Sequence, residues 1–542
     1  MCCSTDMISE LIFINLCKQS VRLPDSGTSS CHAESTSTNL ADLFSEIAEK
    51  RASSLAVSTA STSWSYHSLL TAVHRIAQQL RNSPGFQPGN RVLLLTPNSV
   101  EYIAAFYGIL MAQGVVVPLA INLESGTFEK ILKSTNATQV ITTPQVIKRR
   151  PDLQQLQNTD SPGDEHRDSD CVLSAHSNNI PTDLAAIFFT AGSSGTPKGV
   201  MLSHSNLISN AQSIQEYLEF DASERPLCVL PFHHAFGNSV LQSHLLLGAH
   251  LVLDGNTTFP ESIIEALNQH QCTSLSAVPD LFRILLERTS FGQTETPSLK
   301  YMSVAGGALE HSLSVDISRS ISPARFFVMY GQTEATARLA YVPPEQLANV
   351  SAGCIGQAIP QVTLEVVDES GQPVEPATVG ELRAQGPNLM LGYWGDPAST
   401  RERIRGGWLY TGDLATTDET GWIFIKGRRN SLVKISGYRV HPADLEEFAM
   451  RSFPIAQAVA IPFESKNVGT RLALYIKPAV NEPELSVSEM ITVCRKNLPR
   501  QMVPDHIHIV NNFPLNHAMK VDRQRLSQLM KDIEKNQQLL KQ

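Results

Sequence analysis

A stretch rich in glycine and hydroxyl side chains, FFTAGSSGTPKGVMLSH, runs from Phe188 to His204. Glycine lets a backbone come close to a ligand, and successive N–H groups then form a concave site for negative oxygens. Four hydroxyl groups between Thr190 and Thr196 add hydrogen-bond donors, and Lys198 adds a positive charge. A buried strand before the loop and a helix after it would present backbone donors to phosphate groups. Taken alone, the stretch equally fits an ordinary flexible loop, because it lacks the G-x-x-x-x-G-K-[ST] order of a P-loop.

The composition is typical of a globular protein. Apolar residues make up 42% and charged residues 18% of the 542 positions, and this length requires two or three domains. The net charge of −9 comes without a basic block, so no nucleic-acid or anionic-membrane partner is indicated. The nine cysteines include no C-x-x-C pair, so we expect reduced thiols in the cytoplasm rather than a zinc site or a disulfide framework.

One uncharged stretch, Ile103 to Ile121, has the length of a membrane span. Gln113 and Gly114 interrupt it, and Pro118 ends a run of three valines. We therefore predict a buried helix followed by a buried strand, with no integral membrane span. Residues 1–38 lack a positive segment at their start and are predicted to be a loosely ordered tail.

From Leu40 onward, apolar runs typical of buried strands alternate with stretches of helical periodicity. The runs are RVLLL at 91–95, VVVPL at 115–119, PLCVLPF at 226–232, AHLVLD at 249–254, TSLSAVP at 273–279 and ARFFVMY at 324–330. This alternation predicts an α/β fold in which helices cover a mostly parallel sheet. The polar residues 148–183 are read as a loop or linker.

Short strands punctuated by glycine begin at Gly353 and predict a β-rich subdomain. After GRRN at 427–430 the chain has the length of one more small domain. We predict a large N-terminal domain over 39–429 and a small domain over 430–542, which the family resemblance described below implies to be a mobile α+β domain.

Five further motifs follow the glycine-rich loop in order: YGQTEAT from Tyr330, GYWGDP from Gly392, GWLYTGDL from Gly407, GRRNSLVKISGYRV from Gly427 and PLNHAMKVDR from Pro514. Together the set resembles the adenylate-forming superfamily, in its acyl-CoA synthetase branch, from about Leu40 to the C-terminus. The resemblance implies a reaction in two halves. A carboxylate attacks the α-phosphate of ATP and releases pyrophosphate, and a thiol, usually of coenzyme A, then displaces AMP.

The resemblance also implies roles for single residues. Glu334 would bind Mg²⁺, Lys520 would contact the carboxylate and the α-phosphate, and Lys434 would serve the thioester half. The loop and four later segments would bind ATP and AMP. These residues are Thr190, Gly192, Ser193, Ser194, Gly195, Thr196, Lys198, Gly306, Gly307, Ala308, Tyr330, Gly331, Gln332, Thr333, Asp413 and Arg428.

The acyl pocket would form around PFHHAFGNSV, which begins at Pro231. His234 would enter the carboxylate site, and Phe236 would form a pocket wall. Ala235 stands where amino-acid-activating relatives usually have an aspartate. A buried ammonium group would have no partner there, so we expect an acid without an α-amino group.

Two positions depart from the family pattern. Met519 stands where relatives usually have glycine, next to Lys520. Asn430 replaces the Asp or Lys at the hinge about which the small domain turns, and Asn tolerates the backbone angles that a hinge needs. Beyond that hinge, Ser436 and Gly437 would leave room for a pantetheine arm.

The expected cofactors are ATP, Mg²⁺ and coenzyme A, and the expected substrate is a fatty or other acyl acid. Two alternatives stay open. The chain could load the phosphopantetheine of a stand-alone carrier protein, or it could be a non-catalytic relative that binds a nucleotide or an acyl group.

Overall fold

The structure is a computed structural model that describes residues 11–16, 39–157, 183–190, 197–307, 309–429, 433–435, 438–440, 442–465, 469–479, 486–514 and 521–529. The chain divides into two compact units. The first comprises Met1–Leu364 and Ala384–Leu409, and the second comprises Glu365–Arg383 and Tyr410–Gln542. The domain boundary predicted at 429/430 falls within the second unit and remains a prediction. Within the described residues, no helix combines the length and the apolar character needed to cross a membrane.

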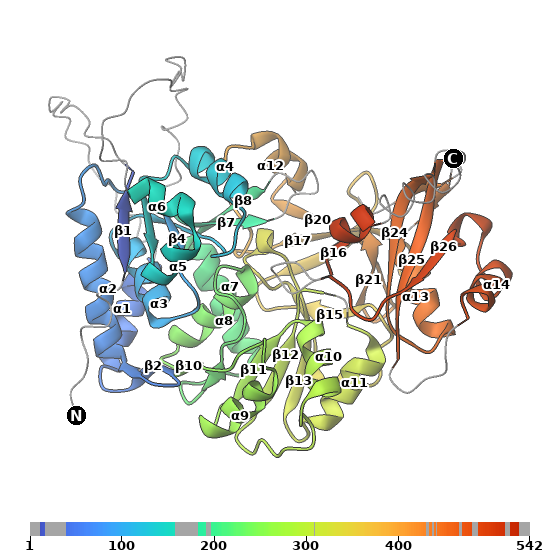
Figure 1. The fold of residues 1–542 in the computed structure, drawn as a ribbon, viewed down its shortest axis with the longest axis horizontal. Helices are drawn as coiled ribbons and strands as arrows, with labels where there is room; N and C mark the ends of the chain where they lie inside the picture. Colours follow the sequence, from blue (N-terminus) through green and yellow to red (C-terminus); the bar gives the residue numbers. More distant parts are fainter. Residues whose placement is uncertain are drawn as a thin grey trace, which may run out of the picture. The chain divides into compact units, whose positions relative to one another are not determined.

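A seven-stranded sheet lies in the first unit (Figure 1). Its order is β1 (Ile12–Asn15), β6 (Gln139–Thr142), β4 (Arg91–Leu95), β5 (Val115–Pro118), β7 (Leu184–Thr190), β8 (Lys198–Ser203) and β18 (Gly392–Tyr393). The strands from β6 to β7 are parallel, and β1, β8 and β18 pair antiparallel with their neighbours. Strand β4 is buried at every residue, as expected of a sheet covered on both faces.

Helices pack on this sheet. Leu93, Val117 and Ile187 share a buried cluster with Phe128 and Ile131 of α4 (Ser125–Thr135). The other helices of this region are α1 (Leu40–Lys50), α2 (Tyr66–Arg81), α3 (Val100–Met111), α5 (Pro144–Arg149), α6 (Pro151–Gln157) and α7 (His204–Leu218). The uncharged stretch therefore consists of helix α3 followed by strand β5, which confirms the prediction of a buried helix and a buried strand.

A second run of strands in the first unit carries the next helices. Its order is β3 (Ser63–Ser65), β2 (Leu55–Thr59), β10 (Leu251–Leu253), β9 (Pro226–Leu227), β11 (Ser274–Ala277), β12 (Tyr301–Val304), β13 (Arg325–Tyr330), β14 (Ala340–Val342) and β15 (Cys354–Ala358). The strands from β2 to β13 are parallel. Helices α8 (Ala235–Leu245), α9 (Glu261–Gln269), α10 (Pro279–Arg288) and α11 (His311–Ser320) lie between them along the chain. The predicted α/β class is confirmed.

The second unit is richer in antiparallel strands. Strands β16 (Thr363–Val367), β17 (Gly380–Gln385) and β20 (Trp408–Thr417) lie mainly in this unit. With β21 (Ile423–Arg428) they are neighbours in the order β16, β17, β20 and β21, and β22 (Val433–Ile435) pairs with β23 (Tyr438–Val440). A three-stranded sheet of β24 (Ile455–Ser465), β25 (Gly469–Pro478) and β26 (His506–Ile509) follows, with helices α13 (Pro442–Ser452) and α14 (Val487–Asn497). One core cluster includes Leu445, Ala460 and Leu474, and another includes Val459 and Tyr475.

The glycine-rich stretch differs from the expected strand, loop and helix. It connects two antiparallel strands, because Thr190 of β7 pairs with Lys198 of β8. Helix α7 begins only at His204, after β8, where Ser203 and Asn206 form a capping box. Val200 and Leu202 are fully buried, and this burial favours a strand at that place. The N-terminus of α7 is therefore separated from the loop by six strand residues.

Two stretches predicted to lack regular structure contain elements. Within the predicted tail, Ile12–Asn15 forms β1, and Ile14 is 2% exposed. Within the predicted linker, Pro151–Gln157 forms α6, and Leu153 is buried in the same cluster as Ile14. Strand β1 comes from the short apolar run Leu11–Ile14, which pairs with β6, and α6 is held by the apolar side chain of Leu153 in the same core. Residues 1–10, 17–38 and 158–182 lie outside the described residues.

Candidate active site

Lys198 is held by the GYWGDP segment in the first unit. Its Nζ donates to the Oγ of Ser399 at 2.7 Å and lies 3.9 Å from the Oδ2 of Asp396. The same Nζ lies 5.0 Å from the centre of the Tyr393 ring. Asp396 also caps helix α12 (Pro397–Arg403) by accepting from the backbone N–H of Ser399. Hydrogen bonds from Ser399, more than the charge of Lys198, lower the pKa of Asp396.

Glu334 lies in a short 3₁₀ turn, η2 (Thr333–Ala335), within YGQTE. Its Oε1 accepts from the Oη of Tyr393 at 2.8 Å. Burial first, and then the charge of Glu334, raises the pKa of Tyr393, so this hydroxyl stays protonated and donates. The backbone carbonyl of Glu334 accepts from the N–H of Met390 at 2.9 Å. Tyr393 therefore contacts Lys198 with its ring and Glu334 with its hydroxyl.

The YGQTE segment is folded tightly against the residues that follow it. A Cβ on Gly331 would lie 1.7 Å from the carbonyl oxygen of Ala337, so only glycine fits there. The N–H of Leu339 donates to the carbonyl of Tyr330 at 2.8 Å and closes the fold. From Tyr330 to Thr333 the side chains and backbone are half-buried, as residues that contact a ligand would be.

AGGA follows β12 in a turn. Gly306 has φ 90°, a backbone conformation that favours glycine. Gly307 differs, because a Cβ there would meet Pro279 at 3.4 Å, an ordinary contact distance. The requirement for glycine is therefore firm at Gly306 and weak at Gly307. Ala308 lies outside the described residues.

The predicted acyl-pocket residues lie at the start of α8. His234 caps this helix from an extended conformation, and its ring lies 4.3 Å from that of His233, centre to centre. Ala235 is buried and Phe236 half-buried. The turn before them is tight, since a Cβ on Gly237 would lie 2.2 Å from the carbonyl oxygen of Pro231.

Asn98 fixes the same turn and was missed in the sequence. Its Nδ2 donates to the carbonyl of Leu230 at 2.7 Å, and its Oδ1 accepts from the N–H of Phe232 at 2.8 Å. No local signal in the sequence joins positions so far apart along the chain. Tyr393 and Asp396 were missed as well, although they belong to the GYWGDP motif, and so was Ser399, two residues after that motif.

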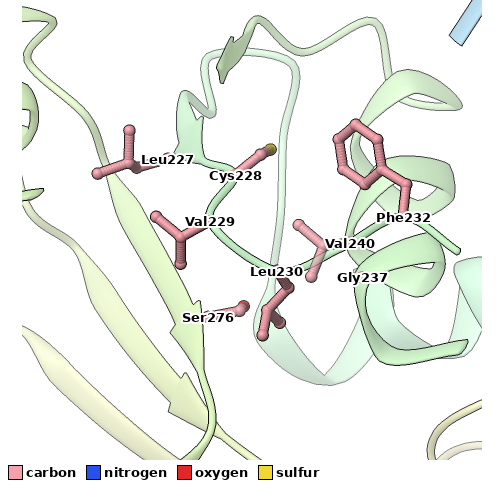
Figure 2. Close-up of a pocket in the computed structure, with 8 residues that line it drawn as sticks. All are labelled: Leu227, Cys228, Val229, Leu230, Phe232, Gly237, Val240 and Ser276. Atoms are coloured by element: carbon pink, nitrogen blue, oxygen red, sulfur yellow. The ribbon is translucent and has the colours of Figure 1, made fainter. Parts of the chain in front are cut away.

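A small pocket with mainly apolar walls lies behind this turn (Figure 2). It is lined by Leu227, Cys228, Val229, Leu230, Phe232, Gly237, Val240 and Ser276. These side chains pack so closely that the pocket has essentially no room even for a water molecule. It therefore cannot be the space that holds an acyl chain.

In the second unit, Asp413 and Arg428 are cross-strand partners on β20 and β21. The Nε of Arg428 lies 3.0 Å from the Oδ1 of Asp413. The Asp413 side chain is 6% exposed and that of Arg428 is 64% exposed. The structure thus joins these two predicted nucleotide-binding residues in an ion pair.

Several predicted site residues are beyond what the structure describes. Lys434 lies on β22, opposite Arg439, but its side chain is not described. The loop residues Gly192, Ser193, Ser194, Gly195 and Thr196, together with Asn430, Ser436, Gly437 and Lys520, lie outside the described residues. Their roles remain predictions.

The described residues suit a metal ion that takes few ligands from the protein and most of its ligands from the bound substrate. Among the described residues, no group of three or more His, Cys, Asp or Glu side chains gathers for a metal. Mg²⁺ commonly takes one or two carboxylates and completes its octahedron with phosphate oxygens and water. Glu334, a half-buried carboxylate with one oxygen on Tyr393, fits such a site.

Comparison with known proteins identifies the family. The family model described as AMP-binding enzyme matches residues 44–394. A long-chain-fatty-acid–CoA ligase of Salmonella typhimurium is 27% identical over 533 residues, covering 90% of this chain and 94% of the relative. An oxalate–CoA ligase of Arabidopsis thaliana is 25% identical, covering 84% and 91%. A feruloyl-CoA synthase of an Amycolatopsis species is 27% identical, covering 86% and 94%.

Solved structures have the same fold. ATP-bound MatB from Rhodopseudomonas palustris superposes with a TM-score of 0.77 at 23% identity, covering 91% of this chain and 99% of MatB. The anthranilate CoA ligase AuaEII gives a TM-score of 0.77 at 19% identity, covering 90% and 96%. The resemblance stated from the motifs is confirmed. The chain belongs to the AMP-binding enzyme family.

Proposed function

We propose that this enzyme is an AMP-forming acid–thiol ligase, which activates a carboxylic acid with ATP and passes the acyl group to coenzyme A. One observation carries the proposal. Tyr393 contacts both Lys198, a cation suited to phosphates, and Glu334, a carboxylate suited to Mg²⁺. Two motifs that lie far apart in the sequence thereby meet at one tyrosine, and membership of the AMP-binding family supports the same function.

In the first half, a carboxylate oxygen attacks the α-phosphorus of ATP. A new P–O bond forms, and the bond from that phosphorus to the bridging oxygen breaks, with its electron pair leaving on pyrophosphate. Lys198 and the backbone N–H groups of the loop stabilise the charge on pyrophosphate. Lys520 offsets the repulsion between the two reacting anions. Glu334 would hold a Mg²⁺ ion, which would supply further charge neutralisation for the phosphates.

In the second half, the thiol gives up its proton to solvent and its sulfur attacks the acyl carbon. A C–S bond forms, and the C–O bond between the acyl carbon and AMP breaks with its electron pair leaving on AMP. We assign this step to the segment that contains Lys434, Ser436 and Gly437. We assign the hinge to Asn430. A turn about that hinge would exchange Lys520 for Lys434.

The relatives and Ala235 bear on the choice of acid. The relatives are named for acids as different as long-chain fatty acids, ferulate and oxalate. Ala235 offers no carboxylate for an α-ammonium group, which favours an acid without one. We place the reaction in the cytoplasm and in fatty-acid or related acyl metabolism.

Product analysis tests the proposal. The purified enzyme is given ATP, Mg²⁺ and a panel of acids, with either coenzyme A or a carrier protein, and the products are identified by mass spectrometry. We expect acyl-CoA and AMP. Acyl-carrier protein alone would favour the carrier-loading alternative. Nucleotide binding without any product would favour a non-catalytic relative.

A further inference from the structure

A buried arginine lies beside the predicted acyl pocket. Arg338 is 2% exposed, and its guanidinium lies 5.3 Å from the centre of the Phe236 ring. Its Nη1 donates to the Oη of Tyr217 at 2.8 Å. Its Nε has no hydrogen-bond partner within the described part of the chain, and no acidic side chain there forms an ion pair with it.

The backbone holds Arg338 in a fixed place relative to YGQTE. The side-chain amides of Asn210 and Asn388 each donate to the carbonyl of Arg338 at 3.1 Å. A Cβ on Gly331 would lie 2.7 Å from the Cα of Arg338, so the two segments are packed backbone to backbone. The arginine therefore belongs structurally to the segment that carries Glu334.

The titratable groups around Arg338 are neutral. Burial lowers the pKa of His244 to about 3, so its imidazole carries no charge near neutral pH. Burial also raises the pKa of Tyr217 and of Tyr301, which both stay protonated. A phenol oxygen and the face of an aromatic ring offset part of the cost of burying a cation, but neither supplies a negative charge.

We propose that Arg338 binds a second carboxylate on the acyl part of the substrate, so that the enzyme prefers dicarboxylic acids to monocarboxylic acids of the same length. A guanidinium pairs with a carboxylate through two parallel hydrogen bonds. A buried polar group left unpaired penalises an analogue that lacks the matching group. The reacting carboxylate is a poor partner, because a paired arginine would occupy the oxygens needed for attack. This inference rests on the proposed function.

Acid-dependent ATP–pyrophosphate exchange measures the preference. Linear monoacids and diacids of matched length, from four to ten carbons, serve as probes. For the wild type we expect kcat/KM at least tenfold higher for the best diacid than for its matched monoacid. Arg338→Gln should reduce this ratio at least tenfold, and Arg338→Lys should reduce it less, because the charge stays and only the fork geometry is lost.

Arg325→Gln is a matched control. Arg325 also lies over a phenylalanine ring, that of Phe327 at 5.4 Å, but its Nη1 is paired with Glu219 at 2.8 Å and its side chain is 42% exposed. The diacid-to-monoacid ratio should be the same in this variant as in the wild type.

The results separate this inference from the proposed function. A wild-type ratio at or below one overturns the inference, even if no Arg338 variant folds. Equal losses for diacids and monoacids in Arg338→Gln also overturn it, because they would place the arginine on the reacting carboxylate. Exchange with monoacids but not diacids overturns the inference and leaves the proposed function intact. Exchange with no linear acid overturns the inference, and the proposed function fails only if the wider acid panel used to test it gives no product either.

Discussion

Two cations of the first unit, Lys198 and Arg338, are held in opposite ways. The Lys198 side chain is 31% exposed, and it rests 3.9 Å from Asp396, whose side chain is 39% exposed. Arg338 is 2% exposed and contacts a phenol oxygen and an aromatic ring. An exposed ion pair contributes about 0–1 kcal/mol, so Lys198 can leave Asp396 for a phosphate at little cost.

The difference indicates which cation serves the reaction and which serves recognition. A cation near water can change partners during a catalytic cycle. A buried cation cannot be solvated when its partner leaves, so the partner must match it in shape and charge. Lys198 is therefore expected to act on every substrate, and Arg338 only on acids that carry a second anionic group.

A third cation, Lys520, should give the largest effect. Lys520→Ala is expected to lower acyl-AMP formation at least ~100-fold, the size of the loss when one charge-stabilising group is removed. This variant should still convert synthetic acyl-AMP into thioester, because we propose that the thioester half of the reaction uses Lys434 instead of Lys520. Lys434→Ala should show the opposite bias. Equal loss of both halves in a folded Lys520→Ala protein would contradict two alternating domain positions.

A substitution at Glu334 tests the proposed Mg²⁺ ligand near Lys198. Glu334→Gln should slow adenylation at least about tenfold, equivalent to about 1.4 kcal/mol of barrier, because the amide binds Mg²⁺ poorly. Pyrophosphate exchange is measured across a Mg²⁺ titration. Glu345→Gln, at an exposed position of the 3₁₀ turn η3 (Pro344–Gln346), is the control and should leave the rate unchanged. An unaltered Mg²⁺ dependence in Glu334→Gln would count against the metal site.

Tyr393→Phe should have an intermediate effect. The variant keeps the ring beside Lys198 but loses the hydrogen bond to Glu334. A hydrogen bond to a charged group contributes roughly 1.5 kcal/mol, so we expect kcat/KM for ATP to fall about tenfold. Tyr475→Phe in β25 is the control. It also removes one tyrosine hydroxyl, but in the second unit, and should have no effect on adenylation. Identical adenylation kinetics in the two variants would show that the Tyr393 hydroxyl has no role in the reaction.

Asp396→Asn should have the smallest effect. The exposed pair with Lys198 is weak, and its loss frees the lysine for ATP. The KM for ATP should stay the same or fall slightly, with less than a roughly threefold change in kcat. A tenfold loss in either parameter would show that Asp396 takes part in the reaction.

Local patterns in the sequence were enough to predict the elements whose neighbours are close along the chain. Helix α3 and strand β5 follow from one interrupted apolar run, and the motifs identify the family. Strand β8 was missed because its residues follow glycines, and only its pairing with β7 makes it a strand. Strand β1 was missed although its apolar run Leu11–Ile14 is a local signal, because its partner β6 lies more than a hundred residues later and the surrounding tail is polar.

The same limit applies to the site. Glu334 and Lys198 were found because motifs contain them, whereas Arg338 follows the YGQTE motif in the stretch ARLAYV, where one charged residue among apolar ones was the available signal. Its burial depends on Tyr217, Phe236 and Asn388, which come from three distant segments. Such a cluster exists only after the chain has folded.

The central claim is that the acid is activated as an adenylate, and the products of a single turnover test it most directly. Enzyme, ATP, Mg²⁺ and a carboxylic acid are mixed without a thiol, and the nucleotide and phosphate products are quantified. We expect AMP, bound as the acyl-adenylate, and pyrophosphate in equal amounts, formed only when the acid is present. Release of ADP and inorganic phosphate, or of AMP in the absence of any acid, would contradict the claim.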